Sequence, residues 1–388
     1  MEKRYTPCNH PTPLIKSSKY LLKKIDIYII KKYLSTFFFT IVLITMIAIT
    51  IDFFEKVDKF MRDSVTTKEI FFDYYLNFIP WINGLLWPLF ALLAVIFFTS
   101  RMAKDSEIVA ILSSGVSYYR LLTPFMVAAS IIASLLWIGN NYVIPNSTKI
   151  KNEFESNHIK KSGKKTLSND IHFFTQPDEK VYIRYFRLRD STPQNFRLEK
   201  FADHQLRYVL KARSLKLKEM NPAGQKGNLW TLNNYEIHTF DGMKENLIIG
   251  KGEKMDTILN FAPEDFIRYS KQMEMMTTPD LKEYIANEKS KGMDTAKKFL
   301  VEYHRRNADP FTILILTLLG VAVASRKVRG GMGFHLASGV VLGAAFVIIS
   351  KFSTTFSSNL SLSPAIGVWL PNMVFAVIAL VMVAKTQR

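Results

Sequence analysis

The sequence predicts an α-helical polytopic membrane protein with six transmembrane helices and an inserted β domain, which is β-jelly-roll-like, a sandwich or a barrel. Six apolar runs are each near the roughly 20 residues that a helix needs to cross the hydrocarbon core. Between the third and fourth runs, short stretches alternate between apolar and polar residues, as half-buried strands do. The six apolar runs are residues 34–51, 78–99, 121–144, 310–325, 334–352 and 366–384.

The charge distribution supports the same fold. The chain has 388 residues, 48% of them hydrophobic, and a formal net charge of +18. If the basic residues formed one surface patch, this charge would suggest a nucleic-acid partner. Instead, many Lys and Arg residues lie at the ends of the apolar runs. Basic residues collect there on the cytoplasmic side of membrane spans. We therefore expect no nucleic-acid partner.

The short loops predict the orientation. Basic residues are frequent before the first run, after the second, after the fourth and at the C-terminus, whereas residues 353–364 carry no charge. Both termini are therefore expected in the cytoplasm, with the long insertion outside it. No A-x-A-like cleavage site follows the first run, so we expect it to remain as a span.

The resulting domain plan has five parts. Residues 1–33 form a cytoplasmic tail and interfacial helix, 34–144 form spans one to three with a cytoplasmic helix within 101–120, and 145–266 form the β domain. Residues 267–309 form a helical connector, and 310–388 form spans four to six. The strand-like stretches of the β domain are residues 180–188, 205–219, 228–240 and 245–259.

The motifs of common enzymes are missing. There is no G-x-x-x-x-G-K-[ST] phosphate loop, no G-x-S-x-G turn, and no H-x-x-x-H spacing among the seven histidines. The single cysteine, Cys8, can form neither an intramolecular disulfide nor a cysteine-based zinc site. We expect no enzyme activity, metal or cofactor in this chain.

The segment 101–120 predicts a short helix between the second and third spans. An acidic residue is expected to cap its start, and a glycine to end it in a left-handed conformation. Helices that lie on lipid usually carry Lys and Arg on their polar face, whereas this one carries an acid, which favours docking to a protein partner. The residues that define this helix are Asp105, Glu107, Ile108, Ile111, Leu112 and Gly115.

Two further features concern the spans. Lys56, Lys59 and Arg62 follow span one among interleaved acids, and either pair with those acids or contact an anionic headgroup. Lys351, near the outer end of span five, either snorkels to the interface or contacts an anionic lipid. Span five also contains small residues four apart, which favour close helix packing. They are Gly339 and Gly343.

At these motifs the chain resembles the lipopolysaccharide-transport permeases of the LptF/LptG (YjgP/YjgQ) family. The similar stretches are "DIYIIKKYL" before span one, "SEIVAILSSGVSYYRLL" after span two, "EYHRRNADPFTILILTLLGVAVA" at span four and "WLPNMVF" in span six. The order of three spans, an external β domain and three spans is similar as well.

The resemblance implies a bacterial inner-membrane ABC transporter permease that pairs with a second permease of this type. A dimeric cytoplasmic ATPase would bind the ATP, and a periplasmic jelly-roll protein would receive the lipopolysaccharide. It implies that 101–120 is the coupling helix, that Glu107 pairs with a basic residue of the ATPase, and that spans one and five form lateral gates. Lys56, Lys59 and Arg62 become candidate phosphate contacts. The alternative is a subunit that transmits ATPase strokes without moving lipid.

Overall fold

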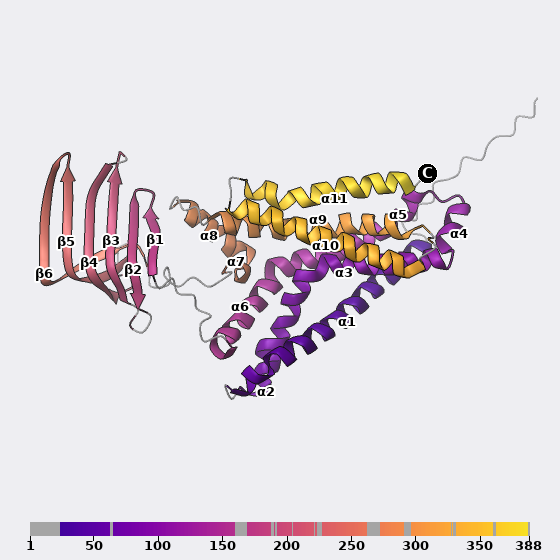
Figure 1. Ribbon diagram of the computed structural model, residues 1–388, viewed down its shortest axis with the longest axis horizontal. Coiled ribbons are helices and arrows are strands. Elements are labelled where there is room, and N and C mark those ends of the chain that lie inside the picture. The colour runs from indigo at the N-terminus through magenta and orange to yellow at the C-terminus, as the bar shows by residue number, and fades with distance from the viewer. Residues whose placement is uncertain are drawn as a thin grey trace, which may run out of the picture.

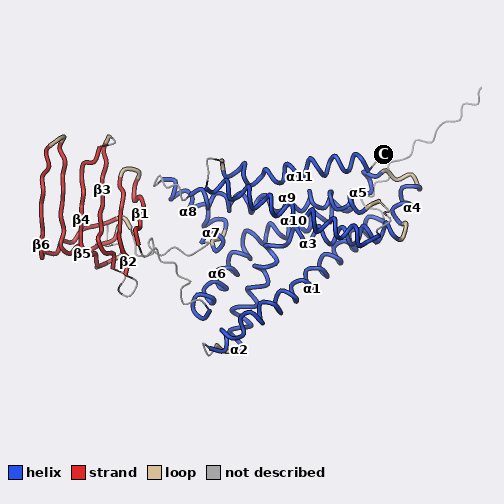
Figure 2. Tube along the Cα trace, viewed as in Figure 1, coloured by secondary structure: helices blue, strands red, loops and turns tan. Residues whose placement is uncertain are grey.

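The computed structural model shows a bundle of long helices with a separate sheet at one end (Figure 1). It describes residues 24–62, 65–159, 169–187, 190, 192–203, 205–220, 222, 227–261, 272–290, 296–326, 328, 331–359 and 362–386. Helices and strands occupy separate parts of the molecule (Figure 2). We call the two ends of the bundle the sheet end, next to the strands, and the α4 end, where the short helix α4 lies.

Six helices among the described residues are long and apolar enough to cross a membrane, as the sequence predicts. They are built on α1 (Lys24–Arg62), α3 (Leu76–Lys104), α5 (Tyr118–Ile138), α9 (Ala296–Ala324), α10 (Gly331–Asn359) and α11 (Pro364–Thr386). The shorter helices are α2 (Thr67–Glu69), α4 (Glu107–Ser113), α6 (Ile144–Phe154), α7 (Gln272–Met275) and α8 (Thr278–Ser290).

The helices extend beyond the predicted boundaries. Residues 1–23 lie outside the described part, but from Lys24 the predicted interfacial helix is the first part of a continuous α1. At the other end of the first half, helix continues past residue 144 to Ile159 instead of giving way to the β domain. Pro145 does not stop it, and this proline lies just after a π-helical turn, Gly139–Val143, within the continuous helix.

Three π-helical turns interrupt this half of the bundle. They are η1 (Ile70–Tyr75), η2 (Gly139–Val143) and η3 (Glu155–Ile159). Such turns are rare and are frequent at functional sites, because they rotate the side chains that follow them. The second one places Asn140 and Asn141 in buried positions within an otherwise apolar helix.

Helix α9 lies at the centre of the bundle. Of its most apolar 18 residues 56% are buried, against 11% for α1 and 22% for α10. Gly320 allows α9 to pack closely on α3, because a Cβ there would lie 2.5 Å from Cγ1 of Val95. Gly339 and Gly343 lie similarly close to the side chains of Ile96 and Leu89 on α3. In lipid, such small residues allow the close packing that holds helices together.

The β domain is one antiparallel six-stranded sheet with its strands in chain order. The strands are β1 (Asn169–Gln176), β2 (Glu179–Arg187), β3 (Thr192–Ala202), β4 (Gln205–Glu219), β5 (Asn228–Asp241) and β6 (Lys244–Leu259). The β-rich insertion is thus confirmed, and its strand order is a meander without the crossovers of a Greek key. Sequence patterning missed β1 and β3.

The sheet has its own hydrophobic core, separate from that of the bundle. Trp230, on β5, is fully buried, and its indole N–H donates to the carbonyl oxygen of Phe261 at 3.3 Å. In Figure 1, β1 lies nearest the helices and β6 farthest from them. Because the pairing follows chain order, β1 and β6 are the two edges of the sheet.

Gly320→Ala tests the packing of α9 on α3. The added Cβ would overlap a stiff valine side chain, so we expect a loss of about 1–3 kcal/mol, as for other overpacked cores. The measurement is the temperature at which half of the detergent-solubilised protein aggregates. Gly333→Ala is the matched control, because nothing lies within 4 Å of a Cβ there. Equal melting temperatures for the two variants would contradict the close approach.

Candidate functional site

The short helix α4 is joined to the end of α3 by a tight turn. The expectation that Asp105 caps α4 is wrong. Asp105 is the last residue of α3's final turn, its N–H bonds to the carbonyl oxygen of Arg101 at 2.9 Å, and Ser106 in a left-handed conformation precedes α4. The connection is too short for Asp105 to leave α3 and cap the next helix. Gly115 follows α4 with a φ of +87°, in the left-handed region predicted for it.

The apolar residues of α4 divide between two faces. Ile108 is buried, and Ile111 packs against the bundle core. Val109 and Leu112 are 59% and 37% exposed and lie three residues apart, on the other face. Sequence reasoning grouped Leu112 with the buried pair and missed Val109. The helix therefore has one face fixed to the bundle and one apolar face free for a partner.

A cluster of charged side chains lies at the sheet end of α1. Lys56 Nζ is 2.7 Å from Asp52 Oδ1 and 3.1 Å from Glu155 Oε1, and Lys151 Nζ is 3.2 Å from the same Glu155 atom. Tyr74 donates to Asp52 Oδ2 at 2.9 Å and accepts from Lys56. We call these five residues the Lys56 cluster. It joins α1 to the η1–α3 segment and to α6 with η3.

The Lys56 cluster bears on the two interpretations of the basic residues that follow span one among interleaved acids. The side chains of Lys56, Lys151 and Glu155 are only 13%, 6% and 14% exposed, and the two lysines are balanced by two carboxylates. Lys59, one turn further along α1, is exposed. The backbone of Arg62 ends α1, and its side chain lies outside the described part. Lys56 thus serves first as an internal tie between helices, and Lys59 is the more accessible cation.

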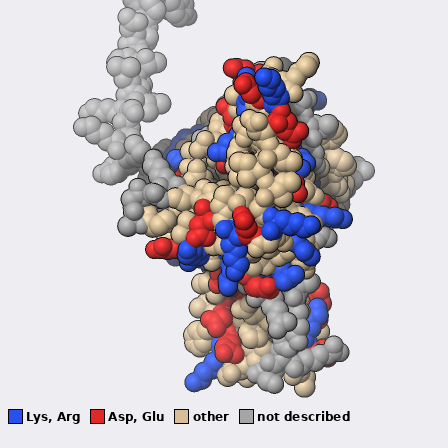
Figure 3. All heavy atoms as spheres, turned by 90° about the vertical axis from the view of Figure 1, so that its left-hand side faces the viewer, with Lys and Arg blue, Asp and Glu red and all other residues tan. Residues whose placement is uncertain are grey.

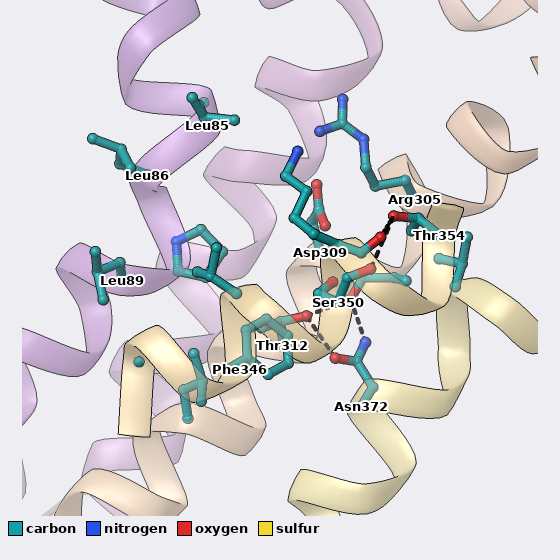
Figure 4. A pocket seen from close by; sticks show the side chains of 18 residues that line it. Leu85, Leu86, Leu89, Arg305, Asp309, Thr312, Phe346, Ser350, Thr354 and Asn372 are labelled. Carbon is teal, nitrogen blue, oxygen red and sulfur yellow. Dashed lines mark hydrogen bonds between the residues drawn. The ribbon is translucent and has the colours of Figure 1, made fainter. Parts of the chain in front are cut away.

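A cavity of about 270 Å³ opens between α3, α9, α10 and α11 (Figure 4). Leu85, Leu86 and Leu89 from α3 line one side, and Figure 4 shows Arg305 and Asp309 of α9 on the other. A second, smaller cavity adjoins it, lined partly by the same residues. The residues shared by both cavities are Gly84, Leu85, Arg305, Asp309 and Lys351.

Polar side chains along the cavity are held by specific hydrogen bonds. Thr312 donates to Asn372 Oδ1 at 2.8 Å, and Asn372 donates to the carbonyl oxygen of Ala308 at 3.1 Å. Asn140, from the π-helical turn η2, donates to Asp309 at 3.4 Å. Ionisable and amide groups inside membrane segments are costly and usually mark functional positions.

The cations at the cavity differ in their pairing. Arg305 and Arg306 both bind Glu302, at 2.9 and 3.0 Å. Lys351 lies within ion-pair distance of no carboxylate among the described residues, and it lines both cavities. The structure therefore brings Lys351 together with Asp309 and Arg305, and not with Lys56 or Lys59. One signal in the sequence, the charged run 302–309 before span four, marks this site.

The lining of the site suits the binding of an amphipathic molecule. Among the described residues, no group of three or more His, Cys, Asp or Glu side chains could hold a metal ion. Its polar groups sit at one end of leucine and phenylalanine side chains, an arrangement suited to a molecule with a charged head and apolar chains.

Comparison with protein-family models gives a match over nearly the whole chain. The family described as "Lipopolysaccharide export system permease LptF/LptG" matches residues 27–385. The match spans α4, the sheet, the cavity and all six long helices. None of the curated proteins matches the chain.

A double-mutant cycle tests the Lys56 cluster. Lys56→Gln and Glu155→Gln each leave a charge with fewer partners, so we expect both to lower thermal stability. The double variant is expected to lose less than the sum, with a coupling of about 0.5–3 kcal/mol for groups in direct contact. Lys59→Gln, which removes an exposed cation from the same helix, is the control and should change little. Strict additivity would contradict the ion pair.

Proposed function

We propose a mechanism from the premise that the chain belongs to the lipopolysaccharide export system permease LptF/LptG family. A member of this family is a transporter permease and not an enzyme, and its six spans make it a multi-pass protein of the inner membrane. The function that this site supports best is the ATP-driven extraction of lipopolysaccharide from that membrane by an ABC transporter of which this chain is one permease subunit.

The α4 end is proposed to face the cytoplasm and to bind the transporter's ATPase. The support is that α4 has two different faces. Its buried residues fix it to the bundle, whereas Val109 and Leu112 remain exposed beside Glu107. An exposed apolar pair with an adjacent acid fits a groove that offers apolar contacts and a basic side chain. ATP would then bind in the partner, and this chain needs no cofactor.

Helices α1 and α10 are proposed as the walls past which lipopolysaccharide moves. They are the two long helices with the least burial within the chain, and their exposed surface is rich in phenylalanine, isoleucine and valine. In the transporter this surface would face lipid, the second permease subunit or the substrate's acyl chains. The outer half of α1 would open by parting from α6 at the Lys56 cluster.

The cavity beside α10 is proposed to hold part of the substrate at the level of its headgroup. Lys351 forms no direct ion pair among the described residues, although the charge of Asp309 acts on it, and a phosphate would supply a direct counter-charge. The adjoining leucines of α3 and Phe346 of α10 would contact apolar chains. This combination of a cation without a direct ion pair and an apolar wall is the observation that carries the proposal.

The sheet is proposed to pass lipopolysaccharide to a periplasmic jelly-roll protein. Strand β6 is an edge of the sheet, and its Leu247, Ile248 and Ile249 are 49–59% exposed. An exposed apolar edge strand is a template on which another protein's strand can pair. The face seen from the sheet end carries interspersed basic and acidic side chains, so it offers no uniform cationic surface for nucleic acid (Figure 3).

Photocrosslinking tests lipid extraction. With a benzophenone amino acid at position 351 or 59, we expect lipopolysaccharide adducts in membranes, because both sites face the proposed path. The same amino acid at Val109, on the opposite end of the bundle, is the control and should give none. A complex that hydrolyses ATP but gives no adduct at 351 or 59 would instead support a subunit that transmits ATPase strokes without moving lipid.

Glu107→Lys tests the docking surface. A cation in place of the acid would repel a basic residue of the ATPase, so we expect co-purification to fall about tenfold or more, as for a lost charge pair at an interface. Pull-down of the ATPase with the tagged permease measures this. Glu283→Lys on α8 makes the same change on an exposed helix at the sheet end and should have no effect. Normal ATPase recovery and normal export in Glu107→Lys would rule out this surface.

A further inference from the structure

An ion pair joins the start of α1 to the start of α5 at the α4 end. Arg120 Nη2 donates to Asp26 Oδ2, across 94 residues of sequence. The Asp26 side chain is only 4% exposed, whereas that of Arg120 is 36% exposed. A buried carboxylate without a counter-charge is costly, so the contact with Arg120 stabilises the charge of Asp26.

Arg120 is attached to α4 through a short and well-fixed turn. After Gly115, the Ser117 side chain accepts from the Arg120 N–H at 3.3 Å and caps α5. Arg120 is therefore in the first turn of the helix that leaves α4. A displacement of α4 moves the guanidinium that holds Asp26.

Helix α4 also acts on α1 electrostatically. The charge of Glu107 on α4 acts on the hydroxyl of Tyr28, which lies two residues from Asp26 on α1. Glu107 is also the acid proposed to meet the ATPase. Binding of a basic partner residue would thus compete with Tyr28, while the Asp26–Arg120 pair would remain as the connection between α4 and α1.

The next contacts of α1 show where it is held and where it is free. Tyr33 is fully buried and shares a 3.0 Å hydrogen bond with Thr317 of α9, and Thr45 donates to Asn83 of α3 at 2.9 Å. Beyond Thr45 the exposed residues dominate up to the Lys56 cluster. Because α1 is continuous, a rotation of α1 imposed at Asp26 would be transmitted to its exposed segment between Thr45 and the Lys56 cluster.

We infer that Arg120 is a positioning residue through which movement of α4 is transmitted to α1, by way of its ion pair with Asp26. The inference rests on the proposed function, since it takes α4 as the site on which the ATPase acts. It adds the contact through which a movement of α4, caused by ATP binding in the ATPase, is transmitted to α1.

The test follows α1 directly, without lipopolysaccharide. Cys8 is first replaced by serine, and Phe54→Cys then provides a single labelling site near the outer end of α1. An environment-sensitive fluorophore is attached there, and the permease is purified in complex with its ATPase. Phe54 is 72% exposed, so the label should be tolerated. The signal is the emission change when ATP and vanadate trap the ATPase. The variants are Asp26→Asn, Arg120→Gln and the charge swap Asp26→Arg with Arg120→Asp. Lys31→Gln, an exposed cation on the same helix, is the control.

We expect the two single variants to lose most of the emission change while ATPase activity and the KM for ATP stay near wild type. Lipopolysaccharide released per ATP hydrolysed should fall about fivefold or more, a typical allosteric coupling. The charge swap should restore both readouts, which a general loss of stability would not allow.

Three outcomes would overturn the inference: an unchanged emission signal in the single variants, a swap no better than either single variant, or no ATP-dependent signal in the parent. Failure of the proposed function looks different. In that case the parent shows the emission change and its loss in the variants, but releases no lipopolysaccharide.

Discussion

The attachment of α1 to the rest of the bundle depends on a few polar contacts. In lipid there is no hydrophobic force between helices, so packing and hydrogen bonds decide which helices associate. Only 11% of the most apolar 18 residues of α1 are buried, although Ile29, Tyr33 and Phe37 pack into the bundle core. Together with this packing, the Asp26–Arg120 pair, the Tyr33 and Thr45 hydrogen bonds and the Lys56 cluster define its position.

Contacts of this kind suit a helix that must move. Interhelical hydrogen bonds in membranes average about 0.6 kcal/mol, with about 1–2 kcal/mol in model peptides. A few of them can fix α1 and still be broken with a fraction of the free energy of ATP hydrolysis. The contrast is α9, whose position depends on close packing around Gly320 and on the buried bonds of Thr312 and Asn372. The chain thus combines a fixed central helix with a weakly packed peripheral one.

The arrangement also explains why charged residues tolerate a membrane setting here. Three largely buried charges have direct ion-pair partners: Asp26 pairs with Arg120 and Lys56 with Glu155 across distant parts of the chain, and Arg306 pairs with Glu302 within its own helix. Lys351 forms no direct ion pair among the described residues and lines a cavity with apolar walls. This difference is why we propose Lys351 as a contact for an anionic substrate.

The sequence predicts the six spans and the β-rich insertion because apolar length and period-two alternation are local properties. The cap at Asp105 was predicted wrongly, since a two-residue connection keeps that residue in the preceding helix. The sequence predicts that Lys56 can pair with an acid of its own helix, as it does with Asp52, but it does not predict the contact with a second helix. Its carboxylate partner Glu155 lies 99 residues away, in a helix that sequence patterning ended too early. The cavity was hidden for the same reason, because Asn140, Asp309 and Lys351 come from three separate segments.

The central claim is that the outer half of α1 must part from α6 for lipopolysaccharide to leave the membrane. The most direct measurement uses Lys56→Cys with Glu155→Cys in a Cys8→Ser background, joined by a reducible bifunctional reagent in proteoliposomes that contain the complete transporter. Before linking, this variant must release lipopolysaccharide with ATP. The account predicts that linking stops release while ATP hydrolysis continues, and that reduction restores it. Release at the same rate with α1 linked to α6 would contradict the account.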